Sequence, residues 1–376
     1  MDISRRVFLR TGIAAGAGTA VLQVPGVAHA QAVPGGMAPV IHVADLFHPH
    51  GDPDDHFDLA VAYALALKGR FDLRGVVIDY PPDFRPGDPA VVAVTQMNAL
   101  AGMAVPVAVG TPHRLKSRRD ALPDASARET AGMRFLLEQL RRAVRPVSVI
   151  CVGSAADIIV AALREPSLFE EKCAGVYLNS GAAHSNPDHP TILEHNVKLD
   201  PAAYAAMFDL PCPLFWFPCW DITERRTSGV DGSFYWLPHK DALDGISAGL
   251  ANFFAYMFSR STAPKWLRDA RKMPPAEMWA GILKEKRGMW STASQFAAAG
   301  LSVTKEGEIV PAAGVGDAAV FALDAVEVSC ADDGRTTWMR VQKEQRPVRR
   351  MLRVTDAARY PAAMTRAVSE LFKAFN

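Results

Sequence analysis

The sequence predicts an α/β protein with an open, mostly parallel sheet that is covered by helices on both faces. Short runs of apolar, β-branched residues recur along the first half of the chain, and stretches with helical spacing separate them. Continuous apolar strands that alternate with helices are typical of parallel sheets buried on both faces. In such sheets the ligand site lies at the carboxyl ends of the strands. The residues that follow each strand are therefore the candidate site residues.

The composition is that of a globular protein. The chain has 376 residues, of which 49% are hydrophobic and 22% charged, which excludes a disordered or fibrous chain. The formal net charge of +1 gives no electrostatic reason to expect a nucleic acid as the partner.

The predicted elements follow one another in a regular order. Strands are expected over residues 40–44, 73–78, 105–109, 147–152 and 175–178, and helices over 57–67, 92–101, 131–142 and 155–163. Beyond residue 200 the pattern predicts a helix over 203–208, a strand over 213–217, a helix over 242–258, two helices within 276–300, a β-hairpin over 319–328 and 336–342, and a closing helix over 360–375. No internal repeat and no clear linker follow Val33, which favours a single domain over residues 31–376.

The first 30 residues have the order of an export signal. A twin-arginine pair, Arg5-Arg6, precedes an apolar stretch rich in Gly and Ala, and the sequence AHA at 28–30 offers a cleavage site. We therefore predict a twin-arginine signal peptide over residues 1–30 and export to the periplasm or beyond. The apolar stretch is shorter than the roughly 20 residues of a permanent membrane span, so no membrane is expected as a partner after processing.

A loop rich in Asp and His, residues 48–56 (HPHGDPDDH), follows the first predicted strand. One aspartate would be enough for turn formation and for capping the next helix. Asp52, Asp54 and Asp55 place three carboxylates within four residues, and these repel one another unless solvent or a cation neutralises them. Oxygen ligands favour Ca²⁺, or Mg²⁺, over zinc. The loop therefore predicts a metal or catalytic site.

From this loop onward the chain resembles a known family. The stretch DPDD at 52–55 resembles the acidic fingerprint of the nucleoside hydrolases, the inosine-uridine-preferring N-ribohydrolases. Five more stretches resemble motifs of that family in the same order, namely DLRGVV at 72–77, VPVAVG at 105–110, VGSAAD at 152–157, YLNSG at 177–181 and EHNVKLDP at 194–201. The resemblance covers roughly residues 39–225. Each motif alone is a weak signal, but together they occur in the same order as in the family, which makes the resemblance specific.

The resemblance implies a reaction, hydrolysis of the N-glycosidic bond of a ribonucleoside. In the family a bound Ca²⁺ positions the ribose hydroxyls and a water, and an aspartate takes the proton of that water. The transition state is similar to an oxocarbenium ion, so surrounding carboxylates stabilise its charge. Carried over by position, Asp54 is the general base, Asp55 is a metal ligand, and the backbone carbonyl of Ala156 is another ligand.

Further residues are expected to bind the substrate. The resemblance assigns Glu194, Asn196 and Asn179 to the ribose hydroxyls. Asp79 is a substrate-binding candidate because it follows the second predicted strand. The family also suggests a homo-oligomer.

The chain departs from the family pattern at two places. Where the family has an aspartate four residues before the base, this sequence has His50, so Asp45 or Asp52 would have to replace that aspartate, or His50 would itself bind the metal. The family's C-terminal H-D-P, which supplies a metal carboxylate and the leaving-group acid, has no clear counterpart. The two positional candidates are Trp290-Ser291-Thr292, which lacks a carboxylate, and Gly316-Asp317-Ala318.

Other side chains leave alternatives open. His56 and His195 flank the acidic motifs and are candidate leaving-group acids, although a lone histidine is more often structural. Several tryptophans are candidates for stacking on a base or sugar, namely Trp216, Trp220, Trp236 and Trp290. Three functions therefore stay open: a metal-dependent hydrolase of a ribonucleoside or related ribosyl compound, an exported non-catalytic binding protein, and a hydrolase of another glycoside.

Overall fold

The computed structural model describes residues 36–49, 53–80, 88–183, 193–221 and 228–376. Its strands are β1 (Ala38–Ala44), β2 (Phe47–His48), β3 (Phe71–Ile78), β4 (Asp88–Pro89), β5 (Val107–Val109), β6 (Val147–Cys151), β7 (Cys173–Asn179), β8 (Leu214–Phe217), β9 (Tyr235–Pro238), β10 (Lys286–Met289), β11 (Leu301–Val303), β12 (Ile309–Pro311), β13 (Phe321–Cys330), β14 (Thr336–Arg340) and β15 (Arg349–Val354). Its helices are α1 (Asp54–Leu67), α2 (Val91–Ala101), α3 (Ala131–Arg142), α4 (Ala156–Arg164), α5 (Pro166–Lys172), α6 (His195–Leu199), α7 (Pro201–Met207), α8 (His239–Leu243), α9 (Ala248–Phe258), α10 (Trp266–Asp269), α11 (Ala276–Leu283), α12 (Thr292–Ala298) and α13 (Tyr360–Phe372), with 3₁₀ turns η2 (Gly316–Ala318) and η3 (Lys373–Phe375).

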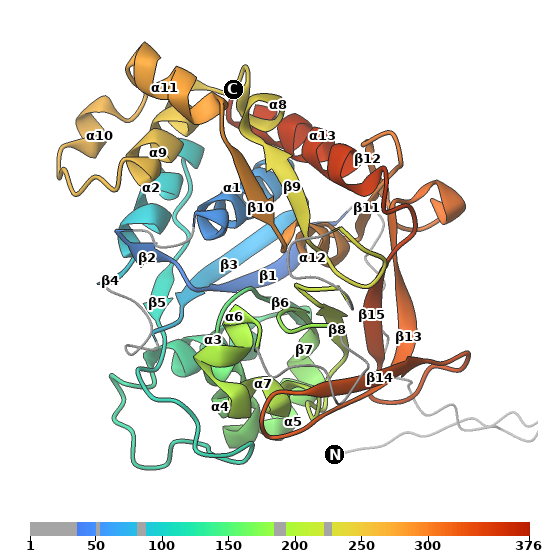
Figure 1. The fold of residues 1–376 in the computed structure, drawn as a ribbon. Coiled ribbons are helices and arrows are strands. Elements are labelled where there is room, and N and C mark those ends of the chain that lie inside the picture. The colour runs from blue at the N-terminus through green and yellow to red at the C-terminus, as the bar shows by residue number, and fades with distance from the viewer. Residues whose placement is uncertain (1–35, 50–52, 81–87, 184–192, 222–227) are drawn as a thin grey trace, which may run out of the picture.

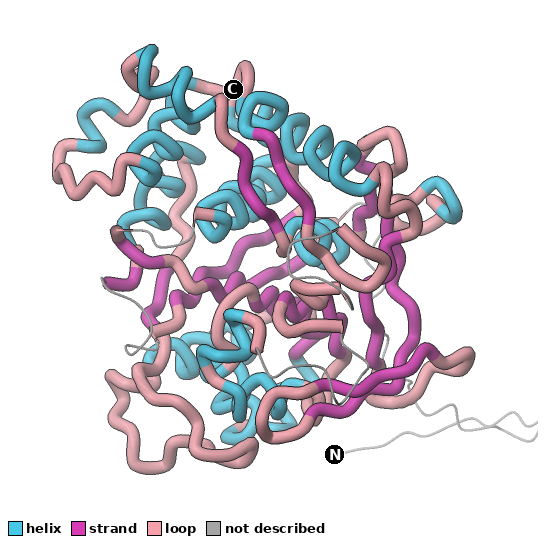
Figure 2. The backbone as a smooth tube through the Cα atoms, in the orientation of Figure 1, coloured by secondary structure: helices cyan, strands magenta, loops and turns pink. Residues whose placement is uncertain are grey.

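A nine-stranded sheet runs through the middle of the molecule (Figures 1 and 2). Its strand order is β14-β13-β15-β8-β7-β6-β1-β3-β5. The strands from β15 to β5 are parallel, while β13 and β14 extend the sheet as an antiparallel arm. The predicted mostly parallel α/β fold is thus confirmed, and so is the late hairpin that β13 and β14 form.

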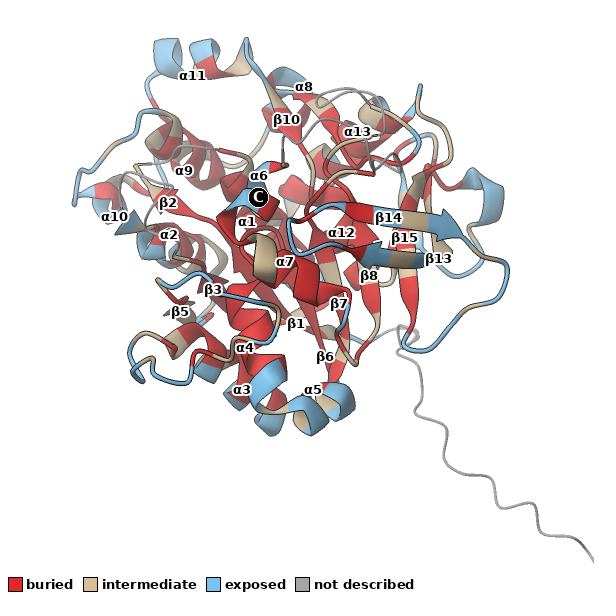
Figure 3. Ribbon diagram, turned by 60° about the horizontal axis from the view of Figure 1, so that its bottom comes forward, coloured by how far each residue is buried: buried red, intermediate tan, exposed pale blue. Residues whose placement is uncertain are grey.

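Helices cover both faces of the sheet. Helices α1, α2, α9, α12 and α13 share the larger hydrophobic core with one face, and α3, α4, α5 and α7 form a second core on the other face. Alternate residues of β1 supply the two cores, because Val40 and Ala44 belong to the first and Ile41 and Val43 to the second. The central strands and the helices packed on them are the buried part of the molecule (Figure 3).

Helix α1 carries the acidic residues into the interior. It is apolar on nearly all sides, and eleven of its fourteen residues are buried, as expected of a helix that lies within a core. The helix begins at Asp54, three residues before its predicted start, and Asp54 and Asp55 occupy its first turn. Carboxylates are stabilised there because the helix dipole is positive at its N-terminus.

The later part of the chain departs from the prediction at several elements, and β9, α10, β11 and β12 were not predicted at all. The helix expected over 242–258 is instead two helices, because Gly245 adopts a positive φ of 76° between α8 and α9. The two helices predicted within 276–300 are α11 and α12, but strand β10 lies between them and pairs with β9. Strand β15, which joins the C-terminal arm to β8, was not predicted.

Two properties of the described residues bear on the export prediction. Within the described ranges, no helix combines the length and apolar character needed to cross a bilayer. The five cysteines are buried and carry free thiols. The predicted signal peptide itself, residues 1–30, lies outside the described residues.

Candidate active site

A cavity of about 420 Å³ opens at the carboxyl ends of the central strands, where the strand-end rule predicts a site. The segments that follow β1, β6, β8 and β10 contribute to its wall, together with the first turn of α1 and the start of α6. Its lining residues are Asp45, Asp54, Asp55, Val152, Glu194, His195, Asn196, Cys219, Trp220, Trp290 and Ser291.

Three carboxylates from the first strand and helix line this cavity. Asp45 follows β1 directly and is 3% exposed, and Asp55, in the first turn of α1, is 5% exposed. Asp54 lines the same cavity. Asp45 and Asp52 were the two candidates for the aspartate that the family has at the position of His50. Asp45 lines the cavity together with Asp54 and Asp55. Asp52 and His50 lie outside the described residues.

Glu194 and Asn196, at the start of α6, line the same cavity. Glu194 caps α6, and its carboxylate accepts hydrogen bonds from the backbone N–H groups of Asn196 at 3.1 Å and Gly181 at 2.8 Å. Burial raises the pKa of Glu194 above its usual value, although these N–H donors oppose the shift. The Asn196 side-chain amide donates to the carbonyls of Val152 at 3.1 Å and Asn179 at 3.0 Å, which ties α6 to the ends of β6 and β7.

Three of the predicted site residues do not line the cavity. Asn179 is fully buried, and its amide nitrogen contacts the carbonyls of Phe217 and Trp290 and the hydroxyl of Ser233 at 3.0–3.1 Å. Asp79 and Ala156 are also buried outside the lining.

Asp79 follows β3 and packs against the turn at Gly153 and Ser154, outside the cavity lining. Its carboxylate accepts a hydrogen bond from the backbone N–H of Ser154, and burial raises its pKa to about 8. A Cβ added at Gly153 would lie 2.5 Å from that carboxylate and 2.8 Å from the backbone nitrogen of Asp45, so Gly153 is required for this close packing. The contacts of Asp79 in the structure are those of a residue that fixes the strand ends.

The segment that would correspond to the missing H-D-P also reaches the cavity. Trp290 and Ser291 line it, whereas Asp317 of the second candidate lies in η2, outside the lining. The hydroxyl of Thr292 is 2.9 Å from that of Tyr235 in the buried interior. At this wall the chain therefore presents a serine hydroxyl and an indole rather than a carboxylate.

Two basic side chains approach the carboxylates. The Arg287 guanidinium Nη1 is 3.8 Å from Asp54 Oδ1, and His195 Nε2 is 3.6 Å from Asp45 Oδ2. Arg287 was missed by the sequence analysis, because it lies in β10, a strand that only its pairing with β9 reveals. Of the four tryptophans considered, Trp220 and Trp290 line the cavity.

The donor groups fit a hard cation in chemistry, since Asp45, Asp54 and Asp55 offer only carboxylate oxygens. Their arrangement is incomplete by itself. Among the residues that the structure describes, no group of three or more His, Cys, Asp or Glu side chains is placed to hold a metal ion. His50 and Asp52, two further predicted ligands, lie outside those residues.

The fold is thus an α/β fold with a mostly parallel sheet, and an acidic cavity lies at the carboxyl ends of its strands. The family model of the inosine-uridine preferring nucleoside hydrolases matches residues 51–361, and the chain belongs to this family. The resemblance noted in the sequence is therefore confirmed.

Solved structures of the same fold are distant in sequence. A plant nucleoside hydrolase, PpNRh1, is 16% identical with a TM-score of 0.52, over 88% of this chain and 99% of its own. The purine-preferring ribonucleoside hydrolase from Gardnerella vaginalis is 16% identical with a TM-score of 0.51, over 89% and 99%. The type III effector protein XopQ, complexed with adenosine diphosphate ribose, is 15% identical with a TM-score of 0.52, over 91% and 94%. No curated protein is detectably similar in sequence.

Proposed function

We propose that this protein hydrolyses the N-glycosidic bond of a ribonucleoside or a related ribosyl compound, with Asp54 activating the water. The observation that carries the proposal is the lining of one cavity, where Asp45, Asp54 and Asp55 meet Glu194 and Asn196. Carboxylates stabilise the positive charge that develops on the sugar during such a cleavage, and a cavity of about 420 Å³ is of the size that encloses a small molecule.

Each polar group has a specific role in this reaction. Asp54 takes the proton of the attacking water, and the Arg287 guanidinium lies 3.8 Å from its carboxylate. Both protons of the Asn196 amide are already donated to backbone carbonyls, so its oxygen is left to accept from a sugar hydroxyl. Glu194 accepts from the backbone N–H groups of Gly181 and Asn196 and from the Ser180 hydroxyl, and the remaining acceptor capacity of its carboxylate takes a sugar hydroxyl.

We also propose that the site takes up Ca²⁺, with Asp45 and Asp55 as ligands together with the loop that holds His50 and Asp52. A bound Ca²⁺ would orient the sugar hydroxyls and polarise the water. Elemental analysis of the purified protein and of Asp55→Ala tests this role. We expect about one Ca²⁺ per chain in the parent and a strong loss in the variant, as is usual when one carboxylate ligand is removed.

The decisive experiment for hydrolysis compares Asp54→Asn with the parent on a panel of nucleosides. We expect turnover, measured as released ribose, to fall about 10²–10⁴-fold while calorimetric affinity for the ligand changes little. Asp244→Asn, at an exposed position outside the cavity, is the matched control and should keep the parental rate. Equal rates in the parent and in Asp54→Asn would refute the role of Asp54.

A second function, ligand binding without turnover, is favoured by one specific observation. Arg287 lies beside Asp54, and Ser291 stands where the family resemblance expects a carboxylate, so the cavity is less acidic than the family pattern. XopQ, which has the same fold, was solved in complex with a ribosyl compound, adenosine diphosphate ribose. Calorimetric binding of nucleosides or adenosine diphosphate ribose by the parent, with no ribose released, would favour this function.

We further propose that residues 1–30 direct export by the twin-arginine route. The motif Arg5-Arg6 and the following apolar stretch support this proposal. Fractionation of cells that express the parent or the Arg5→Lys/Arg6→Lys variant tests it. The parent should be recovered outside the cytoplasm and the variant inside it, and identical distributions would contradict the proposal.

A further inference from the structure

The segment from the end of α9 to Lys284, the C-cap of α11, residues 259–284, differs in charge from the rest of the chain. It contains six basic residues and two acidic ones, a net charge of +4, whereas the whole chain carries only +1. All six basic side chains are exposed, namely Arg260, Lys265, Arg268, Arg271, Lys272 and Lys284. Asp269 pairs with Arg268 and Lys272, and the segment remains positive after that pairing is counted.

The same segment exposes large apolar side chains. Leu267 is 62% exposed, Met273 is 52% exposed and Met278 is 42% exposed. Helix α11, with the sequence AEMWAGIL, is mostly apolar; Ile282 is buried, Trp279 and Leu283 pack against the core, and Met278 is exposed. Several large apolar side chains exposed on one segment indicate an interaction site, whereas a single exposed apolar side chain is ordinary.

The segment is also placed at the edge of the molecule. Helices α10 and α11 lie at an outer corner in both ribbon views (Figures 1 and 3). The backbone carbonyls of Asp269 and Lys272 accept hydrogen bonds from the side-chain amide of Asn252 on α9, at 3.2 and 3.0 Å. The corner is therefore anchored to the core by α9 while its basic and apolar side chains face outward.

We propose that residues 259–284 dock on the surface of a bilayer that contains anionic phospholipids. Basic side chains attract anionic headgroups, and the exposed apolar side chains enter the boundary between headgroups and acyl chains. A nucleic acid would match the charge but offers no apolar surface for Leu267, Met273 and Met278. The combination of both properties therefore favours a lipid surface, and the proposed mode is peripheral rather than spanning.

This docking differs from the sequence prediction, which expects no membrane partner for the processed protein. That prediction concerned segments long enough to span a bilayer, and a surface site of this kind has no such segment. It is also independent of the hydrolase proposal, because none of these residues lines the acidic cavity.

The test is flotation of the purified protein with vesicles of phosphatidylcholine, with and without phosphatidylglycerol. It is done with the full chain and with a chain that begins at Gln31, because Arg5, Arg6 and Arg10 could themselves attract anionic lipid. We expect both forms to float with the phosphatidylglycerol vesicles and not with pure phosphatidylcholine, and the binding to weaken as salt is raised.

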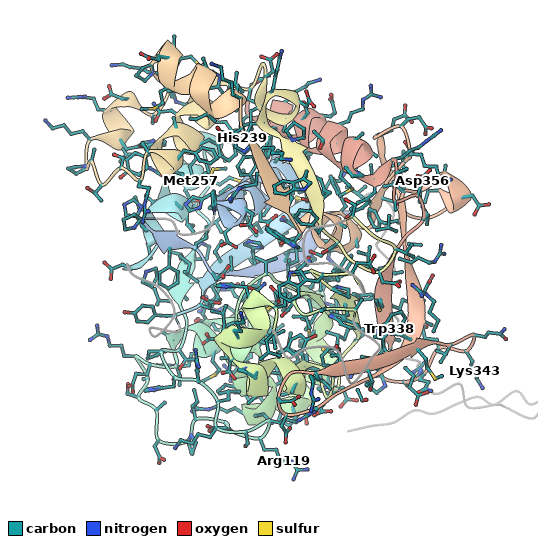
Figure 4. The ribbon with its side chains drawn as sticks, in the orientation of Figure 1. Arg119, His239, Met257, Trp338, Lys343 and Asp356 are labelled. Atoms are coloured by element: carbon teal, nitrogen blue, oxygen red, sulfur yellow. The ribbon has the colours of Figure 1, made fainter. Side chains whose placement is uncertain are left out.

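Variants then locate the docking surface. Lys265→Gln/Arg271→Gln should lower the partition coefficient about 25-fold, since each basic residue near an anionic surface contributes about fivefold. Leu267→Ser/Met278→Ser should lower it about tenfold by removing apolar contact. The matched control is Arg119→Gln/Lys343→Gln, which removes the same charge at positions far from α10 and α11 (Figure 4) and should leave partitioning unchanged.

Three outcomes would overturn the proposal. Failure of the chain from Gln31 to float with phosphatidylglycerol vesicles is the first. Equal weakening in the control pair and in Lys265→Gln/Arg271→Gln is the second, since it would mean a diffuse charge effect. The third is a dimer in solution that Leu267→Ser/Met278→Ser dissociates while lipid binding is absent, which would assign the surface to a second copy of the chain. Unchanged thermal denaturation of the variants shows that folding is preserved.

Discussion

His42 gives the protein a specific sensitivity to acid. Its imidazole lies in β1, fully buried, and neither ring nitrogen has a hydrogen-bond partner among the described residues. Burial disfavours the charged ring and lowers the pKa of His42 from 6.5 to about 4. Between these two values the unfolded chain binds a proton that the folded chain does not, so the free energy of unfolding falls as the pH falls.

The size of this effect follows from the interval between the two pKa values. One pKa unit corresponds to about 1.4 kcal/mol, so His42 should cost the fold about 3 kcal/mol between neutral pH and about pH 4. In His42→Leu the side chain stays apolar at every pH, and it lies on the same face of β1 as Val40 and Ala44, which belong to the larger core. The variant should also be more stable at neutral pH, because two buried nitrogens without partners are removed.

The assay is urea denaturation of the parent and of His42→Leu at a series of pH values from about 7 to about 4. We expect the difference in unfolding free energy between the two proteins to widen by about 3 kcal/mol as the pH falls. A variant that loses as much stability in acid as the parent would refute the assignment of this sensitivity to His42.

Further predictions concern the cavity and its supports. Arg287→Gln removes the cation 3.8 Å from Asp54 and should tighten Ca²⁺ binding severalfold in calorimetry, and an unchanged affinity would argue against the pair. Asn179→Ala leaves three acceptors without their donor and should cost about 3 kcal/mol in urea denaturation, whereas lost affinity at full stability would contradict its structural role. Dialysis against a calcium chelator should lower the melting temperature of the parent and not that of Asp55→Ala, and equal shifts would place the metal elsewhere.

The regular half of the fold was predictable because its signals are local. The runs around Val40, Val76 and Val149 are mostly apolar, and each is followed by a stretch with helical spacing that is rich in apolar residues. These runs form β1, β3 and β6 in the structure, and the three strands are neighbours in the parallel part of the sheet. The edge of the sheet that bears the site could be predicted for the same reason.

Which side chains enter the cavity was less predictable. The strand-end rule pointed to Asp45 and Asp79, and the family resemblance to Asn179, but of these three only Asp45 lines the cavity. The other two turn toward backbone groups of neighbouring segments, Ser154 for Asp79 and Phe217 for Asn179. A rule about position along a strand contains no information on which of these polar partners a side chain will meet.

The later elements depend on contacts between residues far apart in the sequence. Arg287 reaches Asp54 because β10 pairs with β9, and a sequence pattern of four residues cannot reveal that pairing. The break between α8 and α9 at Gly245 was missed for a related reason, since one glycine within an apolar stretch is compatible with a continuous helix. The side chains of β10 and of the segment after it were therefore the hardest part of the site to predict, because their position depends on non-local pairing.

The same wall affects the charge of the cavity. Ser291 adds no negative charge there, and a guanidinium beside Asp54 makes the cavity less negative. A less negative cavity binds a divalent cation less tightly and gives less stabilisation to a cationic sugar, but it tolerates a ligand that carries its own negative charge. A phosphorylated ribosyl compound should therefore gain affinity relative to the neutral nucleoside here, and Arg287→Gln should reduce that preference. An equal preference in the parent and in Arg287→Gln would mean that Arg287 acts on Asp54 alone.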